Sequence, residues 1–124
     1  MVNATLKITV PSLQAMKRDK QKIVVLTSYD YTTTQLINAA GVDIVLVGDS
    51  LGMVKLGYSS TLPVTVEDML YHTRIVAKAN TRALLITDMP LEVFCAPRGI
   101  ADAEETVSVC QLISLKSVLP TTMF

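Results

Sequence analysis

The sequence of 124 residues has no net charge and contains few cysteine, histidine and aromatic residues. Basic and acidic residues number 11 each, so no basic field is available to hold nucleic acid or anionic lipid. The two cysteines, Cys95 and Cys110, lack metal-ligand spacing and predict reduced thiols rather than a zinc site. We therefore expect a cytoplasmic protein that has no nucleic-acid partner.

Long hydrophobic runs are also absent. The longest uninterrupted runs have four residues, whereas a helix needs about 20 to cross a bilayer; three of them are Ile23–Leu26, Ile44–Val47 and Ala83–Ile86. No secretory signal is visible at the N-terminus, so no membrane partner is expected. Hydrophobic residues nevertheless make up 50% of the chain and the mean hydropathy is +0.43, which is enough apolar surface for a folded core.

The three hydrophobic runs predict the fold class. Each is rich in Val, Ile or Leu without alternation, which is typical of parallel strands that are buried on both faces. Helical periodicity and capping residues predict helices around Ser12–Asp19, over Thr32–Ala40 and over Val66–Ala79, with a less clear one over Ala101–Leu112. The alternation of strands and helices predicts an α/β fold with a parallel sheet. The length excludes a complete eight-stranded α/β barrel, which takes about 250 residues.

An aspartate follows each hydrophobic run: Asp30, Asp49 and Asp88. Because parallel strands end at one edge of a sheet, about 4.8 Å apart, two of these carboxylates can share one ion. Mg²⁺ suits such a site, since it binds a few carboxylates and fills its remaining positions with water or substrate oxygens. The alternatives are a helix cap for Asp30 and turn or cap roles for Asp49 and Asp88.

The long segment Gly48–Pro63 predicts a loop that is either functional or disordered. Its residues Gly48, Ser50 and Gly52 match the G-x-S-x-G pattern of hydrolases, which requires a helix directly after the serine and a histidine partner. We expect loop structure after Ser50, and the single histidine, His72, lies in mid-helix, where a structural role is favoured. A hydrolase is therefore not expected.

Several motifs together resemble one known family. The string TSYDYTTTQLINAAGVDIVLVGDSLGMVKLGYSSTLPVTVEDMLYHTRIVAKA, followed by LLITDMP, resembles the N-terminal part of the ketopantoate hydroxymethyltransferases, from about Leu13 to Pro90. The resemblance implies a (β/α)8 TIM barrel, of which about the first three βα units are present. It implies transfer of a hydroxymethyl group from 5,10-methylenetetrahydrofolate to 3-methyl-2-oxobutanoate, giving 2-dehydropantoate for pantothenate biosynthesis. The resemblance further implies that full-length members form homo-oligomers.

The resemblance also implies roles for particular residues. Asp49 and Asp88 correspond to Mg²⁺ ligands, and Asp49, Ser50 and Asp88 correspond to contacts of the 2-oxo acid. A 2-oxo acid can chelate Mg²⁺ through its carboxylate and keto oxygens, and the ion then favours loss of the C3 proton. Ser50 can donate a hydrogen bond to this substrate.

The family pattern stops at about Leu91. The later V-K-x-E-G-G motif is absent, and the glutamate that accepts the substrate proton has no counterpart, so the catalytic base is unknown. We expect a family portion over residues 1–90 and a divergent tail over 91–124, from a truncated or frame-shifted chain with little activity alone. The alternatives are another Mg²⁺-dependent 2-oxo-acid lyase or aldolase, and a non-catalytic flavodoxin-like domain that binds Mg²⁺ or a ligand.

Overall fold

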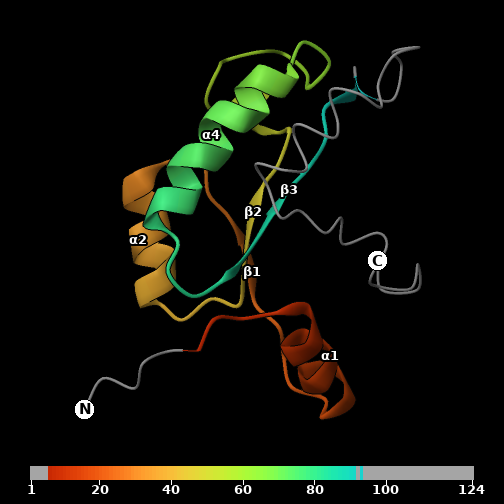
Figure 1. Ribbon diagram of the computed structural model, residues 1–124. Coiled ribbons are helices and arrows are strands. Elements are labelled where there is room, and N and C mark those ends of the chain that lie inside the picture. The colour runs from red at the N-terminus through yellow and green to blue at the C-terminus, as the bar shows by residue number, and fades with distance from the viewer. Residues whose placement is uncertain (1–5, 92, 94–124) are drawn as a thin grey trace.

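The computed structural model describes residues 6–91 and 93. In chain order the elements are α1 (Val10–Arg18), β1 (Val25–Thr27), α2 (Tyr31–Ala39), β2 (Ile44–Val47), α3 (Leu51–Val54), α4 (Val66–Ala79) and β3 (Leu84–Thr87). The three strands form one parallel sheet in the order β1-β2-β3 (Figure 1), which confirms the predicted α/β class. That this sheet is part of a TIM barrel, of which the chain contains about the first three βα units, stays a prediction.

Two of the predicted features lie outside the described residues: the helix over Ala101–Leu112 and the two cysteines, Cys95 and Cys110. The divergent tail lies almost entirely outside them as well. No helix within residues 6–91 and 93 is long and apolar enough to cross a membrane.

The helices begin and end within two residues of their predicted bounds. The Asp30 side chain accepts a hydrogen bond from the Thr33 amide and starts α2, and Gly41 follows the helix with a φ of 78°. Thr65 and Asp68 form a capping box at the start of α4, whose bounds match the prediction. In α1, Thr9 is the N-cap and Pro11 lies in the first turn, so this helix begins two residues before the predicted start.

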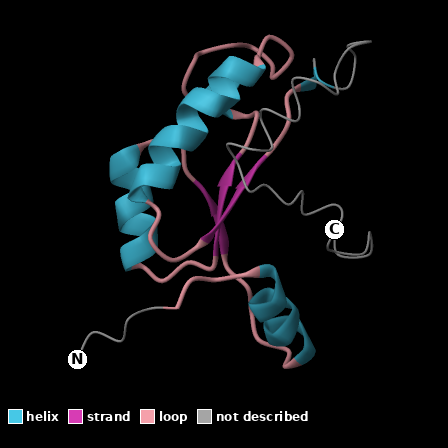
Figure 2. Cartoon of the chain, viewed as in Figure 1, coloured by secondary structure: helices cyan, strands magenta, loops and turns pink. Residues whose placement is uncertain are grey.

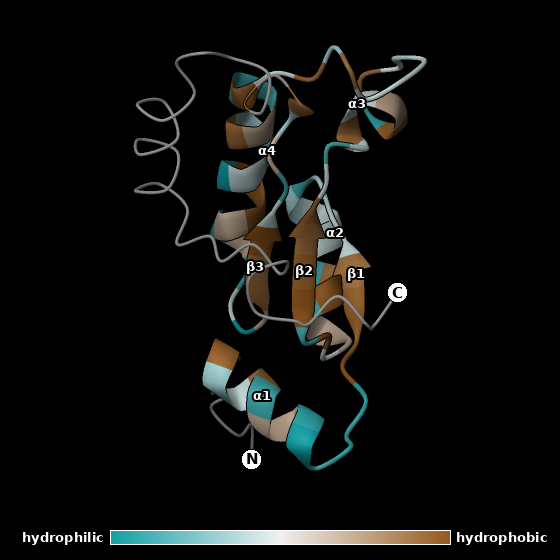
Figure 3. Ribbon diagram, turned by 90° about the vertical axis from the view of Figure 1, so that its right-hand side faces the viewer, coloured by the Kyte–Doolittle hydropathy of each residue, from teal (hydrophilic) through white to brown (hydrophobic). Residues whose placement is uncertain are grey.

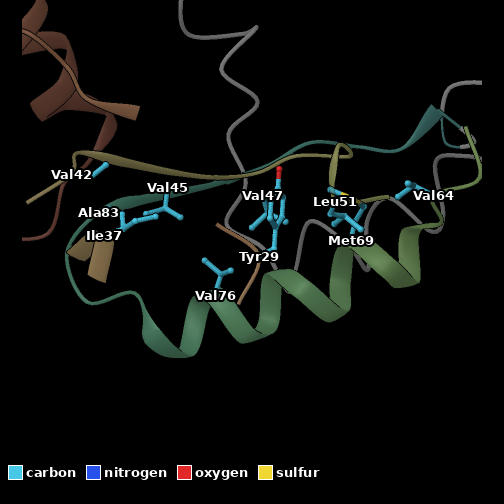
Figure 4. Packing of buried hydrophobic residues seen from close by; sticks show 10 residues of the cluster. All are labelled: Tyr29, Ile37, Val42, Val45, Val47, Leu51, Val64, Met69, Val76 and Ala83. Atoms are coloured by element: carbon cyan, nitrogen blue, oxygen red, sulfur yellow. The ribbon is translucent and has the colours of Figure 1, made fainter. Parts of the chain in front are cut away.

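Helices α2 and α4 cover one face of the sheet, as the cartoon in Figure 2 shows. The core between the sheet and these helices is apolar, and Figure 4 shows its side chains in the layer between the strands and α4. Its buried members are Tyr29, Ile37, Val42, Val45, Val47, Leu51, Val64, Met69, Val76 and Ala83. Because alternate residues of a strand point to opposite faces, Val45 and Val47 belong to this core, whereas Ile44 belongs to the other face.

Helix α1 lies beyond the amino ends of the strands (Figure 3) and contributes to a second apolar cluster on the opposite face of the sheet. Leu13 of α1 forms a second buried cluster with Ile44 of β2 and Ile86 of β3. Figure 3 shows this face, with α1 beyond one end of the apolar strands and α3 beyond the other. The carboxyl ends of the strands, near α3, are thus the ends away from α1.

The first hydrophobic run departs from the prediction of a strand buried on both faces. Within the described chain β1 pairs with β2 alone, and its residues are exposed, with Val25 at 43% and Leu26 at 47%. The central strand β2 comes closer to the prediction, since Val45 and Val47 on one face and Ile44 on the other are buried, whereas Leu46 is half-buried. Runs of similar hydrophobicity therefore differ in burial, because burial depends on what packs against each strand and not on its composition alone.

The expectation of loop structure directly after Ser50 is wrong, because residues 51–54 form the short helix α3. The amides of Met53 and Val54 both donate to the Ser50 carbonyl oxygen, each at 3.0 Å. Gly52 lets this turn pack tightly: a Cβ there would lie 2.4 Å from Cγ2 of Val64. The rest of the predicted loop connects α3 to α4.

Candidate functional site

The candidate site lies at the carboxyl edge of the sheet, where the hydrogen-bond ladder continues past the outer strands. The Ser28 amide donates to the Leu46 carbonyl at 3.0 Å, and the Asp88 amide donates to the Val47 carbonyl at 2.9 Å. The second bond fixes the Asp88 backbone beside the last residue of β2. It therefore places the Asp88 carboxylate next to Gly48, the first residue after that strand.

Gly48 leaves room for two side-chain oxygens. A Cβ on this buried glycine would lie 3.1 Å from Oγ of Ser50 and 3.4 Å from Oδ2 of Asp88. The two oxygens therefore border one small volume, which we call the Gly48 cradle: the space beside Gly48 that Ser50 and Asp88 line. Asp49, between Gly48 and Ser50 in the chain, is half-buried, and Asp88 is exposed.

Asp30, the third aspartate at a strand end, has a structural role. Its Oδ1 accepts from the Thr33 amide at 2.8 Å, and its Oδ2 accepts from Nζ of Lys55 at 3.1 Å. The hydrogen bond from the Thr33 amide is the main reason that the pKa of Asp30 is lowered; the Thr33 hydroxyl and Lys55 act in the same direction. The helix-cap alternative is thus confirmed for this residue.

The two other strand-end carboxylates, those of Asp49 and Asp88, suit a hard cation. Within the described residues no group of three or more His, Cys, Asp or Glu side chains could hold a metal ion. Mg²⁺ does not require such a group, because it is commonly bound by one or two carboxylates together with substrate oxygens and waters. Two carboxylates, that of Asp88 at the cradle and that of Asp49, the residue after Gly48 in the chain, are the number of protein ligands in that pattern of binding.

The structure adds a residue that the sequence did not single out. The Tyr29 hydroxyl lies 2.7 Å from Oγ of Ser50, and Tyr29 is only 7% exposed. Figure 4 shows its ring in the core, with the hydroxyl oxygen pointing away from α4. One feature of the sequence could have identified Tyr29. It lies two residues after β1, at the carboxyl edge of the sheet, where ligand-binding residues gather.

Two neighbouring residues of α4 bind to this edge. Nδ1 of His72 lies 2.8 Å from the Tyr29 carbonyl oxygen, and because a carbonyl can only accept, Nδ1 carries the proton. Next to it, the hydroxyl of Thr73 lies 2.9 Å from that of Thr87, the residue before Asp88. His72 thus has the structural contact that its mid-helix position predicted.

The geometry argues against a hydrolase elbow at Ser50. Ser50 has helical backbone angles, with φ −55° and ψ −14°, instead of the strained turn of a nucleophile elbow. Its hydroxyl bonds to Tyr29, and His72 bonds to the backbone, so these residues form no serine–histidine pair in the described chain.

Comparison with known proteins gives one consistent result. A sequence model of the ketopantoate hydroxymethyltransferase family matches residues 7–116. The chain is 52% identical over 84 residues to the 3-methyl-2-oxobutanoate hydroxymethyltransferase of Moorella thermoacetica, covering 68% of this chain and 31% of the relative. For the proteins of the same name from Magnetococcus marinus and Stenotrophomonas maltophilia, the identities are 56% over 84 residues and 53% over 95 residues.

These last two alignments cover 68% and 77% of this chain, and 31% and 35% of the relatives. The chain thus spans about a third of the length of the curated relatives that it matches. The match to the family model ends at residue 116, within the segment expected to diverge, and the division at residue 90 stays a prediction.

Proposed function

The chain belongs to the ketopantoate hydroxymethyltransferase family, and on that basis we propose that its Gly48 cradle is part of a site for 3-methyl-2-oxobutanoate. The proposed reaction adds a hydroxymethyl group to C3 of this acid. C3 loses a proton and forms the new carbon–carbon bond, 5,10-methylenetetrahydrofolate supplies the carbon, and water supplies the hydroxyl oxygen. The products are 2-dehydropantoate and tetrahydrofolate.

The observation that supports this proposal is the convergence of oxygen donors around Gly48. Oγ of Ser50 and Oδ2 of Asp88 border the same small volume, and Asp49 lies between Gly48 and Ser50 in the chain. Asp49 and Asp88 would hold Mg²⁺, which when bound supplies a positive charge that stabilises negative charge developing on the keto oxygen. Ser50 would donate a hydrogen bond to the acid and orient it.

We further propose that the chain has little activity alone, because none of its motifs supplies the proton-accepting glutamate implied by the family resemblance. A cytoplasmic location, homo-oligomer formation by full-length members and use of the folate donor also stay proposals. Binding of the 2-oxo acid is therefore a better first test than turnover.

Calorimetric titration of the chain with 3-methyl-2-oxobutanoate, in Mg²⁺ and then in excess chelator, tests the proposal. We expect Mg²⁺-dependent binding that falls at least about tenfold in Asp49→Asn and Asp88→Asn, because each substitution removes a charged ligand. Asp19→Asn is the matched control, since Asp19 is an exposed C-cap residue of α1. Equal affinity with and without Mg²⁺, or equal losses in the control, would contradict the metal site.

A second variant addresses the cradle itself. In Gly48→Ala the new methyl group would lie 3.1 Å from Oγ of Ser50 and 3.4 Å from Oδ2 of Asp88, so it would occupy the proposed ligand volume. We expect the acid to bind at least about tenfold more weakly, with a small change in stability, because these contacts are tight without being severe. Unchanged affinity in this variant would place the acid elsewhere.

A further inference from the structure

Either hydroxyl could donate in the hydrogen bond between Tyr29 and Ser50. Binding of the proposed ligand determines which one does. The carboxylate of a 2-oxo acid is an acceptor only, so Ser50 must use its single proton to bind it. Oγ of Ser50 must then accept the proton of the Tyr29 hydroxyl, 2.7 Å away. The phenol, the serine and the ligand would form one chain of hydrogen bonds in which each bond strengthens the next.

The surroundings of Tyr29 hold its phenol in place. Its ring is buried in the cluster that contains Val47, Leu51 and Met69, which limits its rotation (Figure 4). Its backbone carbonyl accepts a hydrogen bond from Nδ1 of His72 at 2.8 Å. The residue is thus fixed by packing at the ring and by α4 at the backbone, and only the hydroxyl reaches the site edge.

Ser50 has less support from its own segment. It is half-buried, and no side-chain hydrogen bond from Ser50 caps α3, although Ser50 occupies the N-cap position. A serine hydroxyl can rotate about χ1 among three staggered positions. The bond to Tyr29 selects the position in which Oγ borders the Gly48 cradle.

We propose that Tyr29 is a positioning residue for this site: its phenol donates to Ser50 and holds the serine hydroxyl toward the bound 2-oxo acid. This inference rests on the proposed function for the identity of the ligand. The Tyr29–Ser50 contact itself does not depend on it. Tyr29 acts through Ser50 and needs no contact with the substrate.

Calorimetric titration with 3-methyl-2-oxobutanoate in Mg²⁺ tests the role in binding. In Tyr29→Phe we expect affinity to fall about three- to tenfold, the worth of one hydrogen bond. Tyr31→Phe is the matched control, because Tyr31 belongs to the same Tyr-Asp-Tyr motif and is 47% exposed. In a Ser50→Ala background, Tyr29→Phe should cause no further loss, because its effect passes through the serine. An additional loss there would show a general structural role and overturn the proposal.

A measurement without ligand separates this inference from the proposed function. In NMR coupling experiments we expect a single Ser50 rotamer in the parent chain and in Tyr31→Phe, and rotamer averaging in Tyr29→Phe. If the chain fails to bind the acid but Ser50 loses its rotamer in Tyr29→Phe, the proposed ligand is wrong and the positioning contact stands. If the acid binds and Ser50 stays ordered in Tyr29→Phe, the positioning role is wrong and the proposed function stands.

A third measurement covers the case in which Tyr29→Phe does not fold. The parent chain and Ser50→Ala, labelled with 3-fluorotyrosine, are compared by fluorine NMR. The Tyr29 signal should move in Ser50→Ala, and in the parent it should move again on saturation with the acid. A Tyr29 signal at the same position in the parent and in Ser50→Ala would overturn the proposal.

Discussion

Asp30 illustrates at the scale of a residue how an aspartate at a strand end can be committed to helix capping. Its carboxylate bonds to the amide and hydroxyl of Thr33 and to Lys55. These contacts favour the ionised form, so the pKa of Asp30 is lower in the folded chain than in the unfolded chain. The stabilisation is therefore fully present above the ordinary value of 3.8 and is lost as the pH falls through the folded pKa.

We predict that Asp30→Ala lowers the free energy of unfolding by about 1 kcal/mol at neutral pH, the usual cost of a lost N-cap. Urea unfolding measured between neutral pH and strongly acidic pH checks this. The difference from the parent should shrink in acid, where the parent carboxylate becomes protonated. Lys55→Ala is the control for the exposed ion pair, and its effect should be smaller. A difference that does not depend on pH would contradict a role for the charge.

At the scale of an element, α3 depends on Gly52. Alanine favours helices by about 1 kcal/mol over glycine, but a Cβ here would lie 2.4 Å from Cγ2 of Val64 and 3.2 Å from Cδ2 of Tyr58. Val64 is buried, with 1% of its surface exposed, so it cannot move aside freely. The steric cost therefore exceeds the gain in helix propensity.

We predict that Gly52→Ala destabilises the chain by about 1–3 kcal/mol, the range for overpacked cores. Thermal unfolding followed by circular dichroism is the measurement. Met53→Ala, at the next position of the same helix, is the control, because Met53 is 50% exposed and its change should be near zero. A melting temperature of Gly52→Ala at or above that of the parent would refute the steric argument.

The extent to which sequence predicts structure differs between elements for physical reasons. The bounds of α4 follow from the sequence because the capping box and the apolar period are both local signals. The burial of β1 does not follow from its sequence, because burial depends on which segments pack against the strand. At the site, the strand-end positions of Asp49 and Asp88 were predictable from the parallel pattern. The Tyr29–Ser50 bond joins residues 21 positions apart, and no local pattern specifies such a pair.

At the scale of the whole molecule, the sheet has a hydrophobic edge. In the described part of the chain β1 pairs on one side only, and its Val25 and Leu26 are 43% and 47% exposed. Backbone groups on such an edge can pair with strands of another molecule, and lysine on the edge opposes that pairing. The purified chain should therefore associate as its concentration rises.

We predict that Val25→Lys lowers the associated fraction several-fold at equal concentration, as measured by sedimentation velocity. Val54→Lys provides the control, because it introduces the same charge at a site on α3 that is 66% exposed and outside the sheet. Association that is equal in the parent and in Val25→Lys would show that β1 is not the contact.

The two contacts made by adjacent residues of α4 have a consequence for motion. His72 is hydrogen-bonded to the segment after β1, and Thr73 is hydrogen-bonded to the end of β3. One turn of α4 therefore contacts the ends of both outer strands of the sheet. A displacement of α4 along its axis must carry both strand ends in the same direction. We therefore expect the thermal fluctuations of the two outer strand ends to be correlated through α4, with the spacing between these ends preserved.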